Sequence, residues 1–496
     1  MGCCASELEE RTQKVAEVTE DHKDPLDIVV NIVEAKGVPD CDTNGINGKE
    51  EQKADTFCQF FIAEDAEGKH IVSNKERTPY RLNTPEPKWS CHRRLHGKYN
   101  KEKRMYLVMD LYDFDTYSKP DLIGGTVVDI TDIESGKTIT SDIHFYGSNQ
   151  KDMQKKAKKS GQKCTVTFQT FTGKKWPTKK TFFFIRHGES KWNEAEHQIL
   201  KEGKVLGGVT TMAKGRDHPL NYIGIQQAYD LNKRWKEKNN DKPELGPTPT
   251  EEDIEKFVNA DKVLSSPLTR ALQTCLIGLE GHKTLTDKGV RLHRQLREVK
   301  NRIGWDALGK ETGEKIPVRI ASCLTEEAKA RAEELKDLTP EEVKKLTSVE
   351  IDLNDTFSHW WDPDRDTKSE ISERITDIMH TLRYCDEETI ICTGHSLFFR
   401  EICRAYIGGG HKTIPQKLGK KEKKEREVIK KQQKTKEYNG WAATEFPQAL
   451  IKRKLNNGAC LMANFDFSSD QPEKWEIASA KLMFGSKFKS EKKVYI

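Results

Sequence analysis

The chain lacks the features that mark secreted and membrane-spanning proteins. Its twelve cysteines include no CxxC pair and no even, disulfide-like spacing, which argues against a disulfide framework. No run approaches the roughly 18 apolar residues that a membrane span needs, and no apolar stretch of signal-peptide length opens the sequence. We therefore expect a protein of a reducing, cytosolic compartment whose membrane attachment is peripheral.

A strong charge of one sign is missing as well. Lys and Arg number 84 against 79 Asp and Glu, so the net charge is only +5, too little to argue for a nucleic acid partner. What the chain does have is length. Its 496 residues suffice for two or three domains, because single cores stop growing near about 250 to 300 residues.

The pattern along the chain predicts a multidomain protein. Residues 1–25 are charged and poor in large apolar side chains, which favours a flexible tether. Residues 26–172 hold short β-rich runs separated by Asp, Asn, Gly and Pro, as in an all-β sandwich. Residues 173–180 suit a linker. In residues 181–496, apolar strand-like runs alternate with helical stretches, which predicts an α/β domain whose mostly parallel sheet is covered by helices on both faces.

Charged stretches interrupt the predicted α/β domain. Residues 325–348 and 412–453 look like inserted helical segments, and the second contains a lysine-dense run from Lys417 to Lys436. Because glutamates are interleaved with these lysines, the run fits a solvated helix as well as a lipid-binding patch. The acidic run from Asp362 to Asp366 has no His or Cys beside it, so we expect a solvated turn rather than a metal site.

Three polar motifs each follow an apolar, strand-like run. Ligands bind at the carboxyl ends of the strands in open α/β sheets, so these motifs are expected to converge in space. Their two arginines and two histidines suit the oxygens of a phosphoryl group, which predicts a phosphate pocket. The motifs are Arg186-His187-Gly188-Glu189-Ser190, Ser265-Ser-Pro-Leu-Thr-Arg270 and Thr393-Gly394-His395-Ser396.

These residues resemble the histidine phosphatase superfamily, which includes the cofactor-dependent phosphoglycerate mutases. Four segments follow the family's order, namely residues 186–193, 217–224, 266–274 and 394–396. The resemblance implies that His187 is the nucleophile and takes up phosphate without a catalytic cofactor, and that Glu298 is the general acid. It also implies a set of phosphate-binding residues, Arg186, Asn193, Arg270 and His395. The chemistry agrees, because nearby guanidinium groups keep a histidine neutral and able to attack.

The resemblance leaves the reaction partly open. Family mutases carry a characteristic sequence around the acid, and residues 298–304 depart from it, which favours a phosphoric monoester hydrolase over a mutase-type phosphotransferase. A membrane adaptor with a non-catalytic phosphate-binding domain is the other alternative. Phosphoprotein, inositol phosphate and metabolite phosphate all remain possible substrates.

The predicted sandwich resembles the C2 domain, which binds lipid in a calcium-dependent manner. Residues 113–124 match the third calcium loop of that family, and residues 34–45 with Asp55 resemble the first loop. An insertion at 46–53, and Thr56 where the family prefers Pro, depart from the pattern. Converging carboxylates suit calcium, which takes oxygen ligands. The implied calcium ligands are Asp42, Asp55, Asp113, Asp115 and Asp121.

The first residues fit a lipidation pattern. Gly2 is placed for N-myristoylation, and the adjacent Cys3 and Cys4 suit palmitoylation. Because one myristoyl chain binds membranes only marginally, a second signal is expected. Together these features predict a phosphatase that is lipid-anchored on the cytoplasmic face of an anionic phospholipid membrane.

Overall fold

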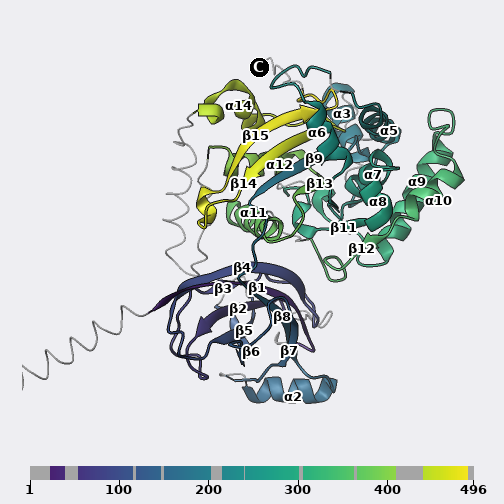
Figure 1. Cartoon of the computed structure of the whole chain (residues 1–496). Helices are drawn as coiled ribbons and strands as arrows, with labels where there is room; N and C mark the ends of the chain where they lie inside the picture. Colours follow the sequence, from purple (N-terminus) through teal and green to yellow (C-terminus); the bar gives the residue numbers. More distant parts are fainter. Residues whose placement is uncertain are drawn as a thin grey trace, which may run out of the picture. The chain divides into compact units, whose positions relative to one another are not determined.

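The computed structural model describes residues 23–39, 54–114, 119–146, 150–202, 215–239, 241–300, 305–361, 366–408 and 440–489. The chain divides into two compact units between Lys175 and Trp176 (Figure 1). Several predicted features lie outside the described residues: Gly2, Cys3, Cys4, Asp42, Asp115, the insertion 46–53 and the run from Lys417 to Lys436.

The N-terminal unit is built from two four-stranded sheets, with strand orders β4-β1-β8-β7 and β3-β2-β5-β6. All of the strand pairings described within them are antiparallel. The elements are β1 (Asp24–Lys36), β2 (Thr56–Ala63), β3 (Glu76–Arg77), β4 (Lys88–Tyr99), β5 (Tyr106–Asp113), β6 (Asp121–Asp129), β7 (Thr138–Asp142), α2 (Gln150–Ser160) and β8 (Thr165–Thr172).

Alternation along the strands forms the core of this unit. In β8, Val166 and Phe168 are buried whereas Thr165 and Thr167, which alternate with them, are partly exposed, because successive side chains of a strand point to opposite faces. Both residues pack in one apolar cluster with Val30 from β1 and Phe60 from β2. The unit is thus a β-sandwich, as predicted.

The C-terminal unit contains a seven-stranded sheet of order β12-β11-β10-β13-β9-β14-β15. The five strands from β12 to β9 run parallel, and β14 and β15 are antiparallel additions at one edge. The strands are β9 (Lys179–Arg186), β10 (Lys262–Ser265), β11 (Val290–Leu292), β12 (Ile351–Asp352), β13 (Thr389–Gly394), β14 (Cys460–Asp466) and β15 (Glu476–Met483).

Helices cover both faces of this sheet, so the predicted fold class is confirmed for both units (Figure 1). The helices are α3 (Lys191–Glu202), α5 (Tyr222–Lys236), α6 (Glu251–Val258), α7 (Thr269–Gly278), α8 (Lys283–Lys288), α9 (Lys315–Ala330), α10 (Pro340–Thr347), α11 (Lys368–Arg383), α12 (Ser396–Tyr406) and α14 (Glu445–Lys452). Short 3₁₀ turns are η1 (Arg294–Leu296), η2 (Trp305–Ala307), η3 (Gly440–Ala443) and η4 (Pro472–Lys474).

The burial of strand β9 on both faces explains why its sequence is continuously apolar. Phe182 and Phe184 pack with α11, α12 and α14 on one face, and Phe183 and Ile185 pack with α5 to α10 on the other. A strand buried on both faces carries apolar residues at every position. β9 begins at Lys179, inside the stretch suggested as a linker, and Trp176 packs its ring against Tyr384 at 5.3 Å between centroids.

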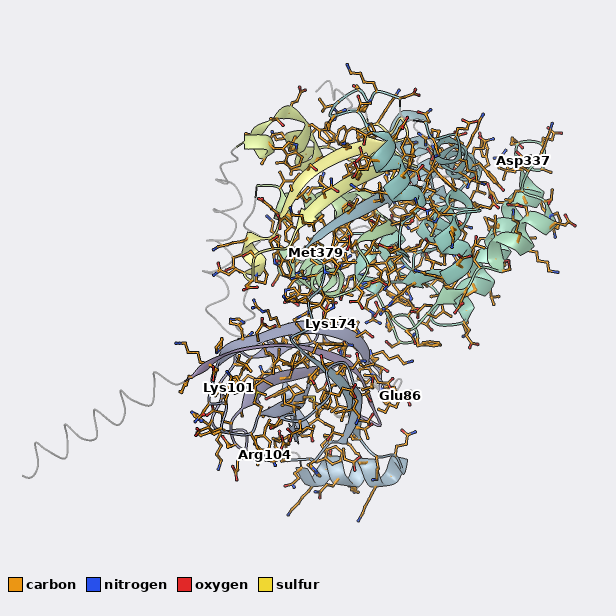
Figure 2. All side chains as sticks on the ribbon, in the orientation of Figure 1. Glu86, Lys101, Arg104, Lys174, Asp337 and Met379 are labelled. Atoms are coloured by element: carbon orange, nitrogen blue, oxygen red, sulfur yellow. The ribbon has the colours of Figure 1, made fainter. Side chains whose placement is uncertain are left out.

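The surface of the C-terminal unit carries the charged segment 325–348. It holds the end of α9 and all of α10, and Asp337 between them lies at the outer edge of the unit (Figure 2). Across the described ranges, none of the helices is both long and apolar enough to span a bilayer.

Candidate active site and candidate calcium site

The three polar motifs meet at the carboxyl ends of neighbouring strands in the C-terminal sheet. β10, β13 and β9 are adjacent parallel strands, and each motif continues from the carboxyl end of one of them. Backbone hydrogen bonds join the motifs: His187 N donates to Gly394 O at 3.0 Å, and Ser266 N donates to Thr393 O at 2.8 Å. Motifs that lie about 80 to 200 residues apart in the sequence therefore form one site.

His187 follows β9 and is 3% exposed. Its Nδ1 lies 2.6 Å from Gly188 O, and because a carbonyl oxygen only accepts, Nδ1 must carry the hydrogen. Burial lowers the pKa of His187 well below its usual range, and the Arg270 and Arg186 guanidinium groups lower it further. The ring is therefore neutral, with the lone pair on Nε2.

Two buried arginines stand beside this ring. Arg186 donates from Nη1 to Leu455 O at 2.7 Å, and its buried Nε has no hydrogen-bond partner among the described residues. Arg270 donates from Nη1 to Asp306 O at 2.8 Å and pairs with the Asp306 carboxylate at 3.4 Å. Burial, partly opposed by Glu298, lowers the pKa of Arg186 to about 10. Arg186 therefore stays cationic at neutral pH, and the two guanidinium groups form a site for an anion.

His395 lies beside His187 and is fully buried. Its ring centroid lies 5.0 Å from that of His187, and its Nε2 lies 2.9 Å from Ser266 Oγ. Its buried Nδ1 has no partner among the described residues. Burial lowers the pKa of His395 well below its usual range, with further contributions from Arg270, His187 and Arg186. If Ser266 donates to Nε2, Nδ1 carries a hydrogen that a phosphate oxygen can accept.

Asn193 lies in the first turn of α3, half-buried. Its Oδ1 accepts from Ser190 N at 3.3 Å and from Ser190 Oγ at 3.2 Å. The side-chain oxygen is thereby fixed, which directs the amide nitrogen, a donor, to the other side. This arrangement suits a further contact to an anion near the start of α3.

Two glycines bring the first motif against α5. A Cβ on Gly188 would lie 2.4 Å from Gly224 O, and a Cβ on Gly224 would lie 2.0 Å from Glu189 O. Real Cβ atoms do not approach backbone this closely, so both positions require glycine. The contact fixes the loop that carries His187 against the start of the helix.

Glu298 follows η1 and is half-buried. Burial raises the pKa of its carboxyl, and the Asp306 carboxylate adds to the rise, whereas Arg270 and Arg186 oppose it. The same arginines influence His187 and His395, so the carboxyl belongs to the same electrostatic site. A carboxyl with a raised pKa is suited to proton donation.

Buried ion pairs hold the loop that carries Glu298. Asp366 pairs with Arg297 and Arg374, each at 2.8 Å, and also accepts from Lys300 N at 2.8 Å. Arg374 donates to Gln295 O at 3.1 Å and to Arg297 O. Burial lowers the pKa of Arg374 to about 9. Asp366 is 6% exposed, so the expected solvated turn is wrong at this residue.

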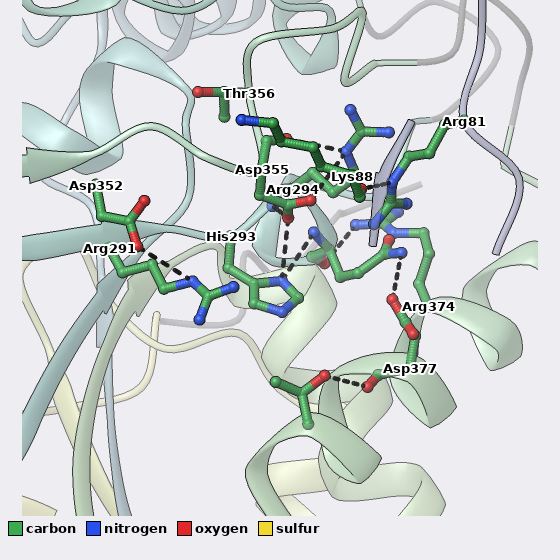
Figure 3. A network of polar contacts seen from close by, with 12 residues as sticks. Arg81, Lys88, Arg291, His293, Arg294, Asp352, Asp355, Thr356, Arg374 and Asp377 are labelled. Carbon is green, nitrogen blue, oxygen red and sulfur yellow. Dashed lines mark hydrogen bonds and ion pairs between the residues drawn. The ribbon is translucent and has the colours of Figure 1, made fainter. Parts of the chain in front are cut away.

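A second network anchors η1 itself (Figure 3). Asp355 accepts from Arg294 N at 2.8 Å and lies 3.8 Å from His293 Nδ1. Arg294 also donates to His359 O at 3.1 Å. The backbone that leads to Glu298 is therefore held from both sides, by residues 355–359 and by α11.

Several polar residues of the site were not singled out from the sequence. Asp306, beside Arg270, follows no strand-like run and carries no local signal. Asp217 lies in the segment 217–224, but the sequence did not indicate a role for it. Its carboxylate accepts from Thr269 N at 2.7 Å and from Thr269 Oγ1 at 2.6 Å. Burial lowers the pKa of the adjacent His218 to about 4, with Arg270 next in effect. These residues support the start of α7, which carries Arg270.

Three of the predicted calcium ligands are described in the N-terminal unit. Thr56 pairs with Asp113, and Asp113 pairs with Asp121, so the start of β2, the end of β5 and the start of β6 coincide. Asp55 N donates to Asp113 Oδ1 at 2.7 Å, and Asp55 Oδ1 accepts from Asn83 N at 2.8 Å. These bonds orient two carboxylates, and an all-oxygen donor set fits calcium. Within the described ranges, no group of three or more metal-binding side chains is assembled.

Comparison with known proteins identifies the class of the N-terminal unit. Residues 26–145 match the family model described as C2 domain. Among curated proteins, none matches the chain. One similar solved structure is a C2 domain of plant extended synaptotagmin 1, with 15% identity, TM-score 0.21, and coverage of 29% of this chain and 92% of that one. Human GIVD cytosolic phospholipase A2 has 17% identity and TM-score 0.20, covering 30% of this chain and 18% of that one.

A third similar structure is a candidate alpha-ribazole-5'-P phosphatase from Escherichia coli. It has 14% identity and TM-score 0.29, covering 63% of this chain and 99% of that one. The C-terminal unit itself has an α/β fold with a mixed sheet and helices on both faces. The chain joins this unit to a C2 domain.

Proposed function

We propose that the chain is a phosphoric monoester hydrolase that works through a phosphohistidine on His187. The observation that carries the proposal is the state of His187: it is buried and neutral, with Nδ1 committed to Gly188 O. The lone pair on its Nε2 is near three buried residues, Arg186, Arg270 and His395, which supply positive charge and hydrogen-bond donors. This pairing of a nucleophile with an anion site suits attack on phosphorus.

In the first step, His187 Nε2 attacks the phosphorus atom, and the bond from phosphorus to the leaving oxygen breaks. Glu298 donates its proton to that oxygen. Arg186, Arg270, His395 and Asn193 bind the phosphoryl oxygens, where preorganised donors strengthen their hold as negative charge develops. The phosphate charge itself raises the pKa of Glu298 further and favours its acid form.

In the second step, water replaces the leaving group. Glu298, now a carboxylate, takes a proton from the water as its oxygen attacks phosphorus and the bond from phosphorus to nitrogen breaks. Inorganic phosphate leaves, and both residues return to their starting states. An organic hydroxyl in place of water would make the enzyme a mutase-type phosphotransferase.

The N-terminal unit supports a membrane-associated role. In this proposal Asp55, Asp113 and Asp121, with Asp42 and Asp115, hold calcium, which neutralises their charge and links the domain to anionic phospholipid. Myristate on Gly2 and palmitate on Cys3 or Cys4 provide the anchor to the cytoplasmic leaflet. The enzyme then acts on a phosphorylated substrate at that surface.

Release of inorganic phosphate from a panel of phosphomonoesters tests the catalytic proposal. Wild-type protein is expected to turn over and the His187→Ala variant to fall to background. Phosphate binding without turnover by wild type would indicate a non-catalytic adaptor, and transfer to an added sugar or glycerate hydroxyl would indicate a mutase.

Membrane fractionation of cells tests the anchor. Gly2→Ala is expected to move the protein to the soluble fraction, because acylation at Gly2 is lost, and Cys3→Ser with Cys4→Ser is expected to weaken attachment. Unchanged fractionation of both variants would exclude the acyl anchor.

A further inference from the structure

Helix α2, which connects β7 to β8, has two opposite faces. Met153 is buried and Ala157, four residues on, is half-buried, so this face packs on the domain. At 3.6 residues per turn, four exposed lysines fall within roughly 100° of the helix circumference, about opposite to Met153. They are Lys151, Lys155, Lys158 and Lys159, hereafter the lysine stripe.

Helix stability does not account for the stripe. Lys158 and Lys159 favour the helix dipole in the last turn, but Lys151 lies in the first turn, where a positive charge is unfavourable. An ion pair within the helix joins Lys156 to Asp152 at 2.9 Å and does not involve the stripe. Within the described residues, no ion pair involves its four lysines. The stripe thus presents like charges to solvent at a stability cost.

The strand registers place α2 at the same end of the sandwich as the acidic residues. Lys36 at the end of β1 pairs with Thr165 at the start of β8, and Thr165 pairs with Asp142 at the end of β7. Both ends of the connection that contains α2 are therefore at the carboxyl end of β1. The chain enters β2 at this end too: Val38 N donates to Pro85 O at 3.0 Å, and Thr84 N donates to Ala54 O at 3.3 Å.

A direct contact joins the two features. Gly125 of β6 lies four residues after Asp121. It forms paired backbone hydrogen bonds with His144, at 3.0 and 2.9 Å. Helix α2 itself contacts β6, and Figure 1 shows it beside β6 and β7. The lysine stripe and the start of β6, with Asp121, therefore belong to one end of the domain.

We infer that the lysine stripe is a second membrane-docking surface of the C2 domain, specific for anionic phospholipid and independent of calcium. The inference rests on the membrane association proposed above and adds the surface that performs it. Ammonium groups attract the negative headgroups of a leaflet, whereas the carboxylates at the same end repel them until a cation binds. Since no apolar side chain interrupts the stripe, the attraction is electrostatic and declines with salt.

Vesicle sedimentation with the full-length chain, produced without acyl groups, tests this. Vesicles of phosphatidylcholine with one quarter phosphatidylserine are compared with pure phosphatidylcholine, each with calcium and with a chelator. The variant replaces all four lysines of the stripe by Gln. The matched control replaces four exposed lysines of the other unit by Gln, namely Lys329, Lys336, Lys344 and Lys474.

Wild type and control are expected to bind anionic vesicles with the chelator present, and the stripe variant to bind at least a hundredfold more weakly at low salt, from roughly five-fold per lysine. Equal binding by the stripe variant, with calcium-stimulated binding intact, would overturn the inference and leave the proposed C2 function standing. Failure of wild type to bind under either condition would overturn both. Stripe-dependent binding to an acidic polymer such as RNA, without vesicle binding, would overturn the lipid assignment.

Discussion

The two units use charge in opposite ways. In the C-terminal unit, Arg186, His187, Arg270 and His395 are each at most 4% exposed, and the two arginines help burial to lower the pKa of both histidines. In the N-terminal unit, Asp121 and the lysine stripe face solvent. Buried charges interact strongly and resist salt, whereas exposed charges contribute about 1 kcal/mol each and are screened. One unit is thus suited to chemistry and the other to reversible docking.

Among the substitutions in the C-terminal unit, a change at Glu298 should give the largest difference in activity between esters with poor and with good leaving groups. Glu298→Gln should reduce kcat 10²- to 10⁴-fold on esters with poor leaving groups, as loss of a general acid does, but little on nitrophenyl phosphate. Because burial raises the pKa of Glu298, wild-type activity on poor leaving groups should fall as pH rises through that pKa. The variant should lack this decline. Equal losses on both substrates would exclude Glu298 as the acid.

Arg270 tests whether the buried cation acts directly on the phosphoryl group. Arg270→Ala should reduce kcat roughly 10²- to 10³-fold, the effect of losing one preorganised donor group. Arg270→Lys should restore little, since an ammonium lacks the planar fork of a guanidinium. Arg331→Ala, on an exposed arginine at the end of α9, is the control and should leave kcat unchanged. Activity of Arg270→Ala near that of the control would contradict this role.

Asp366 tests the buried supports of the Glu298 loop. Asp366→Asn should lower the free energy of unfolding by about 3 kcal/mol, because it leaves Arg297 and Arg374 without their buried partner. Asp352→Asn, which removes a partly exposed pair to Arg291 at 3.6 Å, should cost less than about 1 kcal/mol. Denaturant unfolding of both variants measures the difference. Equal losses in the free energy of unfolding would contradict the expected difference between buried and exposed ion pairs.

A substitution of Asp113, in the N-terminal unit, should give the smallest effect. Asp113→Asn keeps the acceptor for Asp55 N but removes a charge, so calcium-stimulated vesicle binding should require at least about tenfold more calcium. Phosphate release from a soluble ester should stay unchanged. Wild-type calcium dependence in the variant would mean that the domain docks without Asp113.

The sequence predicted positions that depend on local pattern. Arg186, His187 and His395 follow apolar strands, so their convergence at the carboxyl edge could be read from the chain. Asp306 and Asp366 could not, because neither follows a strand-like run and each pairs with an arginine distant in sequence, Arg270 and Arg297 respectively. The lysines of α2 were visible in composition, but only the strand registers locate them at the acidic end of the sandwich.

Trapping the covalent intermediate tests the central claim most directly. Rapid acid-free quenching of wild type with a ³²P-labelled phosphomonoester should yield an acid-labile, alkali-stable phosphohistidine that maps to His187. The His187→Ala variant should yield no labelled protein and no turnover. Label on another residue, or wild-type turnover by His187→Ala, would contradict the proposed mechanism.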